Sequence, residues 1–110
     1  MLNQIVLVGR LVRDPELKKS EKGKHYTQIT LAIPRSFKNA SGEYESDFID
    51  CMLWEGVAKS TTEYCHKGDI VGVKGRIQSR VVEAENEKKY YTDVIAEKVT
   101  FLSSKAKEAN

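Results

Sequence analysis

The segment that decides the fold, residues 34–54, reads PRSFKNASGEYESDFIDCMLW. Its first part places the aromatic side chain of Phe37 between two cations, Arg35 and Lys38. The next four residues, 39–42, are Asn, Ala, Ser and Gly, a composition typical of a tight turn. The segment therefore predicts a chain reversal with an aromatic ring and two positive charges beside it.

The second part of the segment, residues 47–54, alternates as a half-buried β-strand does. One face carries Ile49, Cys51 and Leu53, which are apolar and fit a core. The other face carries Phe48 and Trp54. Aromatic rings beside cations on one sheet face suit a flat, charged polymer such as nucleic acid. Strands favour aromatic residues in general, so either ring could instead pack under a loop or against another subunit.

Length and charge set outer limits on the protein. The chain has 110 residues, which predicts one domain with a single modest core. Its 18 basic and 16 acidic side chains give a net charge of +2, too small to identify a nucleic-acid-binding protein. The charge is uneven, at +5 over residues 1–38, −5 over 39–69 and +2 over 70–110. Any positive surface must therefore be assembled by folding.

The two cysteines, Cys51 and Cys65, fall in apolar phases of the 47–54 strand and of a predicted helix. Buried free thiols in a reducing compartment are expected, and a disulfide is not. The apolar run at residues 5–8 is interrupted by Arg10, and nothing has the pattern of a signal peptide or the length of a membrane span. The sequence predicts a soluble, cytoplasmic protein.

Two strands are expected before the central segment. Residues 1–12 are apolar at every position from 5 to 8, which predicts a strand covered on both faces, by the core and by another element or subunit. Gly9 within it predicts a bulge or a sharp bend. After a lysine-rich loop, residues 26–33 alternate cleanly, and this strand is expected to end at Pro34.

The period changes after Trp54. Apolar residues recur with helical spacing over residues 55–66. Residues 70–82 then alternate again, with a core face at odd positions and three cations, but no acid, at even positions. A polar loop at 83–89 and a returning strand at 90–96, extended to 102, complete the pattern.

These elements amount to five strands with one helix between the third and fourth. The fold class is therefore all-β, and the five-stranded OB-fold barrel has its helix at that place. One OB-fold domain is expected over residues 1–103, followed by a polar, disordered tail at 104–110.

Catalytic and metal-binding chemistry is not expected. The two histidines, His25 and His66, do not form a zinc-binding spacing with the cysteines. No glycine-rich phosphate loop follows a strand, and Asp47 and Asp50 lie on opposite faces of theirs. With no convergent acid/base set, the sequence predicts a protein that is not an enzyme and uses no cofactor or metal.

Several short segments resemble the bacterial single-stranded DNA-binding proteins. They follow the family's order from residue 1 to about residue 102, and together they are specific. These are LVGRL at 7–11, DPE at 14–16, TLA at 30–32, RSF at 35–37, SGE at 41–43, DF at 47–48, GRI at 75–77, with Tyr64, Lys67, Gly68, Tyr90 and Thr92.

The resemblance implies an OB-fold homotetramer that binds single-stranded DNA without sequence preference, in replication, recombination, repair or DNA uptake. It implies base stacking on Phe37, Phe48 and Trp54, the aromatics already noted beside cations. The basic residues expected to contact phosphate are Arg10, Lys18, Arg35, Lys38, Lys74, Arg76 and Arg80.

The sequence departs from that family at two positions. Val82 stands where many members have another tryptophan, and Asp50 stands where many have a basic residue. A stacking contact at residue 82 and a phosphate contact at residue 50 therefore stay open. The chain also ends soon after the expected barrel, so recruitment of replication or repair enzymes through an acidic tail is not expected. It has either been shortened or resembles the short Gram-positive paralogs, some of which act in natural transformation.

Two other function classes remain to be compared with DNA binding. One is an OB-fold adaptor of the primosome or replication-restart type, which would be a dimer acting mainly on other proteins. The other is a barrel nuclease, which would need a carboxylate cluster and a metal. Oligomer mass tests the first alternative, and a nuclease assay with Mg²⁺ tests the second.

Overall fold

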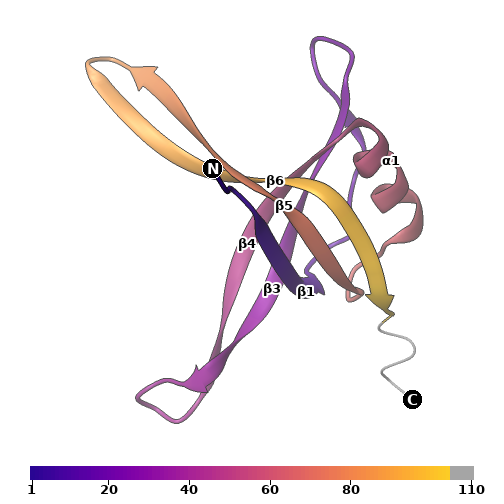
Figure 1. Cartoon of the computed structure of the whole chain (residues 1–110), viewed down its shortest axis with the longest axis vertical. Helices are drawn as coiled ribbons and strands as arrows, with labels where there is room; N and C mark the ends of the chain where they lie inside the picture. Colours follow the sequence, from indigo (N-terminus) through magenta and orange to yellow (C-terminus); the bar gives the residue numbers. More distant parts are fainter. Residues whose placement is uncertain (105–110) are drawn as a thin grey trace.

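The computed structural model describes residues 1–104 as a closed, strongly twisted sheet with one helix (Figure 1). In chain order the elements are β1 (Ile5–Leu11), β2 (Lys18–Lys19), β3 (His25–Lys38), β4 (Tyr44–Trp54), α1 (Glu55–Tyr64), β5 (Ile70–Ala84) and β6 (Glu87–Ser103). The five long strands and the helix after the third of them follow the predicted architecture. The two-residue β2 lies in the lysine-rich loop, where no strand was predicted.

The barrel closes through its first strand. The sheet order is β1-β5-β6-β4-β3-β2, and β1 also pairs with β3 through Arg10 and Leu11. Neighbouring strands are antiparallel except β4 and β6, which share a short parallel pairing at Cys51 and Met52. Side chains from alternate positions fill the interior, and Leu31, Leu53 and Val71 are fully buried. The helix α1 buries Ala58 and Thr61 as it packs against β3, β4 and β6.

The prediction that the second long strand ends at Pro34 is wrong. The strand β3 continues to Lys38, and Pro34 pairs with Ser46 of β4. The pairing of β1 with β3 reaches only to Ala32, so β3 has an open edge beyond it. Proline is tolerated on strands with an open edge, where a missing N–H need not cost a ladder hydrogen bond. Phe37 therefore lies on a strand of the β3–β4 hairpin and not in a loop.

The predicted polar loop at residues 83–89 is also wrong. The strands stay paired as far as Ala84 and Glu87, and only Glu85 and Asn86 form the turn. Both turn residues have positive φ, 31° and 69°, as a tight hairpin turn of the right twist requires. The outer part of this hairpin, residues 76–95, is here called the β5–β6 arm, and it projects away from the barrel (Figure 1).

The bulge predicted at Gly9 is not found there. Gly9 pairs in register with Val71, without a bulge. It instead lets β1 approach β3 closely, because a Cβ there would lie 2.9 Å from Cγ1 of Ile33. One of the register shifts between β5 and β6 lies at another glycine, where Gly75 pairs with Ala96 and the preceding residue, Lys74, pairs with Lys98. This bulge bends the pair where the β5–β6 arm leaves the barrel.

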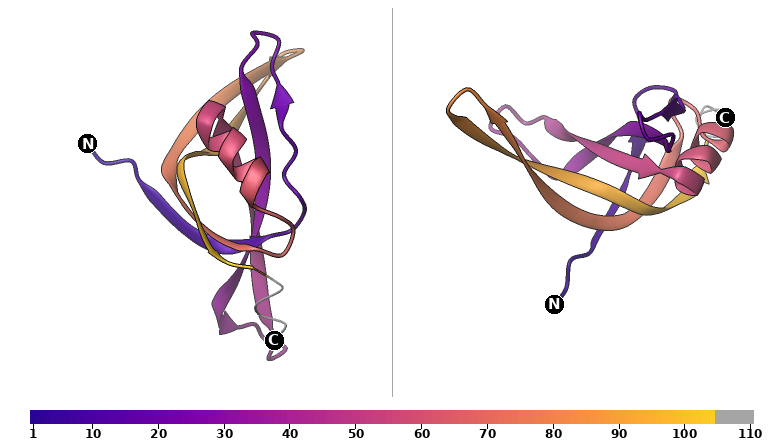
Figure 2. Two further views of the ribbon diagram at one scale, coloured as in Figure 1. Left: turned by 90° about the vertical axis from the view of Figure 1, so that its right-hand side faces the viewer. Right: turned by 90° about the horizontal axis from the view of Figure 1, so that it is seen from above.

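One face of β1 is uncovered in the single chain. Leu11 at its end is buried, whereas Val6 is 68% and Val8 51% exposed. The residues that precede β1 project from the barrel (Figure 2). Cover of this face by another subunit, as the sequence predicted, stays a prediction.

The predicted disordered tail lies, apart from Ser104, outside the described residues. Over residues 1–104 the structure contains no helix with the length and apolar character needed to cross a membrane.

Candidate nucleic-acid interface

A shallow cleft of about 750 Å³ lies between β4, β5 and β6 on the outside of the barrel. Its floor comes from the exposed face of β4, and its walls come from the β5–β6 arm. The strand alternation explains this composition, since residues 48, 50, 52 and 54 share one face. The lining includes Phe48, Asp50, Met52, Trp54, Gln78, Arg80, Tyr91, Asp93 and Ile95.

Two further hollows extend the cleft. One, of about 660 Å³, lies between Trp54, Arg76 and the loop that carries Lys22 and Lys24. It shares Trp54 with the first cleft. The other, of about 430 Å³, is lined by Lys18 of β2, and Gln28 lines both this hollow and the first cleft. The two further hollows therefore each adjoin the first, and the three together are here called the groove. Both of the further hollows are lined by acidic side chains as well as by lysines.

The predicted stacking residues are all solvent-exposed. Phe37 is 64%, Phe48 65% and Trp54 39% exposed, so the rings of Phe48 and Phe37 do not pack under a loop of their own chain. Trp54 rests against Tyr26, with 5.3 Å between ring centroids and 40° between planes. Phe48 and Trp54 line the groove, whereas Phe37 lies farther along β3, toward the tip of the β3–β4 hairpin.

Arg80 is oriented by two residues of the neighbouring strand. Its Nε donates a hydrogen bond of 2.7 Å to Asp93, and its guanidinium carbon lies 4.6 Å from the ring centroid of Tyr91. The register pairs Arg80 directly with Tyr91. The even face of β5 carries no acid, as predicted, but β6 supplies one. Sequence reasoning missed Tyr91 and Asp93, although their alternate spacing on the returning strand was a usable signal.

The other two cations predicted on β5 are separated by the bulge. Arg76 lines the groove beside Trp54, and its Nη1 donates a 2.6 Å hydrogen bond to Gln78. Lys74 pairs laterally with Val6 of β1 and Lys98 of β6, away from the groove-lining residues. The structure therefore brings Arg76 and Arg80 together but does not bring Lys74 to them. A phosphate contact by Lys74 stays a prediction for another part of the surface.

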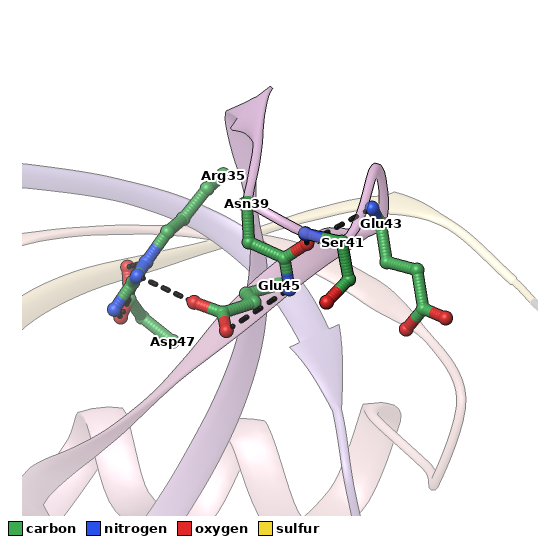
Figure 3. Close-up of polar contacts among 6 residues, drawn as sticks. All are labelled: Arg35, Asn39, Ser41, Glu43, Glu45 and Asp47. Atoms are coloured by element: carbon green, nitrogen blue, oxygen red, sulfur yellow. Dashed lines mark hydrogen bonds and ion pairs between the residues drawn. The ribbon is translucent and has the colours of Figure 1, made fainter.

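Arg35 is already engaged by acidic side chains of β4. Its guanidinium contacts Asp47 at 2.7 Å and Glu45 at 2.8 Å (Figure 3). The hydrogen bond from Arg35, together with its charge, holds the pKa of the Asp47 carboxyl below its ordinary value. Lys38 lies 5.7 Å from the ring centroid of Tyr44, across the same hairpin. Neither acidic partner of Arg35 was anticipated from the sequence.

Of the remaining predicted contacts, Lys18 lines the groove and Arg10 does not. Lys18 lines the hollow beside β2. Arg10 donates a 2.6 Å hydrogen bond to the carbonyl of Gly68, which fixes it near the end of β1. Asp50, the departure from the family pattern, accepts a 2.5 Å hydrogen bond from the hydroxyl of Thr30. A phosphate contact is therefore not favoured at residue 50, although Asp50 lines the groove.

Val82 lies on the exposed β5–β6 arm, opposite Lys89. Its side chain is 40% exposed. The pairing has no register shift between Gly75 and Ala84, so Val82 keeps the strand face of Arg80. The side chain therefore does not pack beneath a hairpin loop.

The two cysteines are buried and not joined in a disulfide. Burial, and to a smaller extent the charge of Asp50, raises the pKa of the Cys51 thiol to about 11. Burial also raises the pKa of Cys65. Within residues 1–104 no three His, Cys, Asp or Glu side chains are grouped so that they could hold a metal ion.

Comparison with known proteins identifies the family to which the chain is similar. The model of the Single-strand binding protein family matches residues 2–102. Single-stranded DNA-binding protein B of Bacillus subtilis (strain 168) is 49% identical over 109 residues, covering 98% of this chain and 96% of that one. Single-stranded DNA-binding protein 3 of Listeria innocua is 45% identical, with 96% of this chain and 66% of its own length covered.

Solved structures share the fold. The single-stranded DNA binding protein from Thermus aquaticus, solved as a deletion mutant, has a TM-score of 0.78 at 27% identity, covering 96% of this chain and 52% of that one. A Plasmodium falciparum SSB complex with ssDNA has a TM-score of 0.78 at 23% identity, with 94% of this chain and 96% of that chain covered. The predicted OB-fold barrel is thereby confirmed.

The match to the family model spans nearly all the described residues, and the Bacillus relative is similar over almost its whole length. Proteins of this family bind single-stranded DNA and are not enzymes, which confirms the prediction that the protein is not an enzyme. The chain belongs to the single-strand binding protein family.

Proposed function

We propose that this protein binds single-stranded DNA without sequence preference and protects it. One observation carries the proposal: Phe48 and Trp54 are exposed in adjoining hollows of the groove, which Arg80 and Arg76 also line. Every base has a π-face, so rings on an open sheet surface accept any base. Cations along the same groove neutralise the backbone that joins the bases.

The groove favours single strands over duplex. A base can stack on Trp54 or Phe48 only if it is not already stacked between its neighbours in a helix. Arg80 sits over Tyr91 with its Nε on Asp93, which holds the guanidinium at the groove wall. In this proposal its outer edge meets a phosphate while the bases face β4. Lys18, Lys22 and Lys24 continue the track around Gln28 and Trp54.

We further propose a homotetramer in which another subunit covers the outer face of β1. Val6 and Val8 are exposed, and exposed neighbouring apolar side chains are a common mark of subunit contacts. Such an assembly would lengthen the DNA path by joining several grooves. A monomeric mass at micromolar concentration would contradict this part of the proposal.

The processes that fit this activity are replication, recombination, repair and DNA uptake. Each of them exposes single-stranded DNA, and in a bacterial cell this happens in the cytoplasm. The groove offers no feature that selects one process over another.

The competing function is an OB-fold adaptor that acts mainly on other proteins. The exposure of Phe48 and Trp54 beside two arginines favours DNA, because an adaptor needs no aligned rings and cations. The two functions predict different masses and different DNA affinities. A dimer with no measurable affinity for an oligo-dT strand would favour the adaptor.

Alanine substitutions in the groove test the proposal. Trp54→Ala and Phe48→Ala should each weaken binding of labelled oligo-dT by about 1–3 kcal/mol, the usual value of one base–aromatic contact. Trp54→Phe should retain most of the affinity because a π-face remains. Tyr64→Ala is the matched control: Tyr64 is 67% exposed, but it lies at the end of α1 and outside the groove. Equal losses for Tyr64→Ala and Trp54→Ala would contradict a groove-based path.

A further inference from the structure

Arg35 has every guanidinium nitrogen occupied by a carboxylate. Its Nε donates to both oxygens of Asp47 at 3.2 Å, and its Nη2 donates to Oδ1 of Asp47 at 2.7 Å. Its Nη1 donates to Oε2 of Glu45 at 2.8 Å. Figure 3 shows the two carboxylates converging on the guanidinium. A phosphate that approached Arg35 would find the Nε–Nη2 edge already paired with Asp47 and one N–H of Nη1 engaged by Glu45, so a two-point contact on that edge requires it to displace Asp47.

Arg80, which lines the cleft, differs. It uses only Nε, toward Asp93, and its guanidinium lies over the ring of Tyr91. Its two terminal nitrogens make no hydrogen bond to residues 1–104 and can meet a phosphate without any rearrangement. The two arginines therefore have different starting states. Arg80 is oriented and its terminal nitrogens are available, whereas each nitrogen of Arg35 already donates to a carboxylate.

We propose that Asp47 and Glu45 compete with DNA phosphate for Arg35, and thereby limit how tightly the β3–β4 hairpin holds single-stranded DNA. This inference rests on the proposed function and describes the regulation of the same interface. A carboxylate pairs with the guanidinium edge in the geometry that two phosphate oxygens adopt. In the hairpin, the carboxylates of Asp47 and Glu45 thus occupy donors of Arg35 that a DNA phosphate would use.

The hairpin turn positions one of the two competing carboxylates, that of Glu45. Nδ2 of Asn39 donates to Oε1 of Glu45 at 3.3 Å, on the side away from Arg35. The side-chain oxygen of Asn39 in turn accepts hydrogen bonds from the backbone N–H groups of Ser41 and Glu43, at 2.9 and 3.0 Å. Asn39 therefore links the turn geometry to the position of Glu45. The position of the Glu45 carboxylate is therefore set by the structure of the hairpin itself.

Solvent exposure makes this competition reversible. The side chains of Arg35, Glu45 and Asp47 are 39%, 51% and 45% exposed. Ion pairs with such exposure are weak and are screened by salt. DNA can therefore displace the carboxylates, at a cost to its affinity.

The competition has a signature in salt dependence. A phosphate that meets an unpaired cation releases a condensed counterion, which steepens the slope of log K against log salt by about 0.7. A phosphate that displaces the carboxylates from Arg35 leaves them to recruit cations from solution, which cancels that release. Arg35 therefore contributes little to the slope until its carboxylates are removed.

The test compares binding of a fluorescein-labelled oligo-dT by the natural chain, by the double variant Glu45→Gln/Asp47→Asn, and by Glu43→Gln, from about 50 to 200 mM salt. Glu43→Gln is the matched control, because it removes a charge from the same hairpin while its carboxylate points away from Arg35 (Figure 3). Each variant is also made with Arg35→Ala. Asp47→Asn alone, which leaves Glu45 in place, supplies a second variant if thermal unfolding shows the double variant to be unstable.

We expect the double variant to bind about threefold to tenfold more tightly at low salt, with a slope steeper by about 0.7. Asp47→Asn alone should give a smaller gain of the same kind. The gain should vanish in the Arg35→Ala background. An equal gain for Glu43→Gln, or a gain that persists without Arg35, would show a general charge effect and overturn the inference. Failure of the natural chain to bind oligo-dT would instead contradict the proposed function, so the two failures are distinguishable.

Discussion

Gly75→Ala provides a stringent test of how the β5–β6 arm is attached to the barrel. At this position β5 and β6 shift register, and Gly75 faces Ala96 of the opposite strand. An added Cβ would lie 3.0 Å from the carbonyl carbon of Ile95 and 3.1 Å from Cα of Ala96, and closer still to the Ile95 oxygen. All three are backbone atoms, so no side chain can rotate away.

The size of the effect follows from that geometry. To relieve the clash between the added Cβ and the backbone, β6 must move away from β5 in the middle of their pairing, near residues 74–76. Overpacking in a protein interior costs about 1–3 kcal/mol, and a clash with backbone belongs at the upper end. For a domain of this size about 3 kcal/mol lowers Tm by roughly 12–24 °C. Because Arg76 adjoins the bulge, the arm should also lose its alignment with Trp54, so affinity for oligo-dT should fall.

The assay is thermal unfolding at fixed protein concentration, followed by the same DNA titration. Gly72→Ala is the control in the same strand: its Cβ would lie 3.7 Å from Cδ1 of Leu102, which is an ordinary contact. This control should shift the free energy of unfolding by about 0.5 kcal/mol or less. A Gly75→Ala protein that melts within a few degrees of Gly72→Ala would refute the steric account of the bulge.

Three further predictions concern the groove and the core. Replacing Arg76 and Arg80 together by Ala should make the salt slope of oligo-dT binding shallower by about 1.4, and an unchanged slope would move the DNA path elsewhere on the barrel. Val82→Trp should tighten oligo-dT binding by about 1–3 kcal/mol without lowering Tm, because residue 82 lies on the exposed arm; lower Tm with no gain in affinity would contradict that placement. The free energy of unfolding should be insensitive to the Cys51 thiol below pH 9.0, its ordinary pKa, and should fall as the pH rises toward the folded value of about 11. Urea unfolding across this range should show a weaker decline for Cys51→Ala, and an identical decline would contradict a thiol held neutral by burial.

The central strand was predictable because its pattern is local. Alternation alone placed Cys51 and Leu53 in the core and Phe48 and Trp54 outside, and the structure confirms each position. The same reasoning located α1 from a change of period. Both inferences use only the geometry of one element, which neighbouring residues determine.

The errors arose where a residue's role depends on a partner strand. Pro34 does not end β3, because β1 leaves that edge unpaired. Lys74 keeps the outer face of β5, but it lies across the register shift from Arg76 and beside Val6 of β1, a position that the pattern of β5 alone does not reveal. The acidic partners of Arg35 follow from the β3–β4 register, which pairs Asp47 with Ile33. Cross-strand register is set by turns and bulges, so a single-strand pattern cannot supply it.

The most direct test of the proposed interface is the emission of Trp54, the only tryptophan in the chain. Its ring is 39% exposed and lines two of the three hollows of the groove, so a stacked base should contact it. Titration with oligo-dT should quench this emission strongly, and titration with duplex DNA of equal length should leave it nearly unchanged. Tight binding of oligo-dT with no change in Trp54 emission would place the DNA path away from this groove and contradict the account.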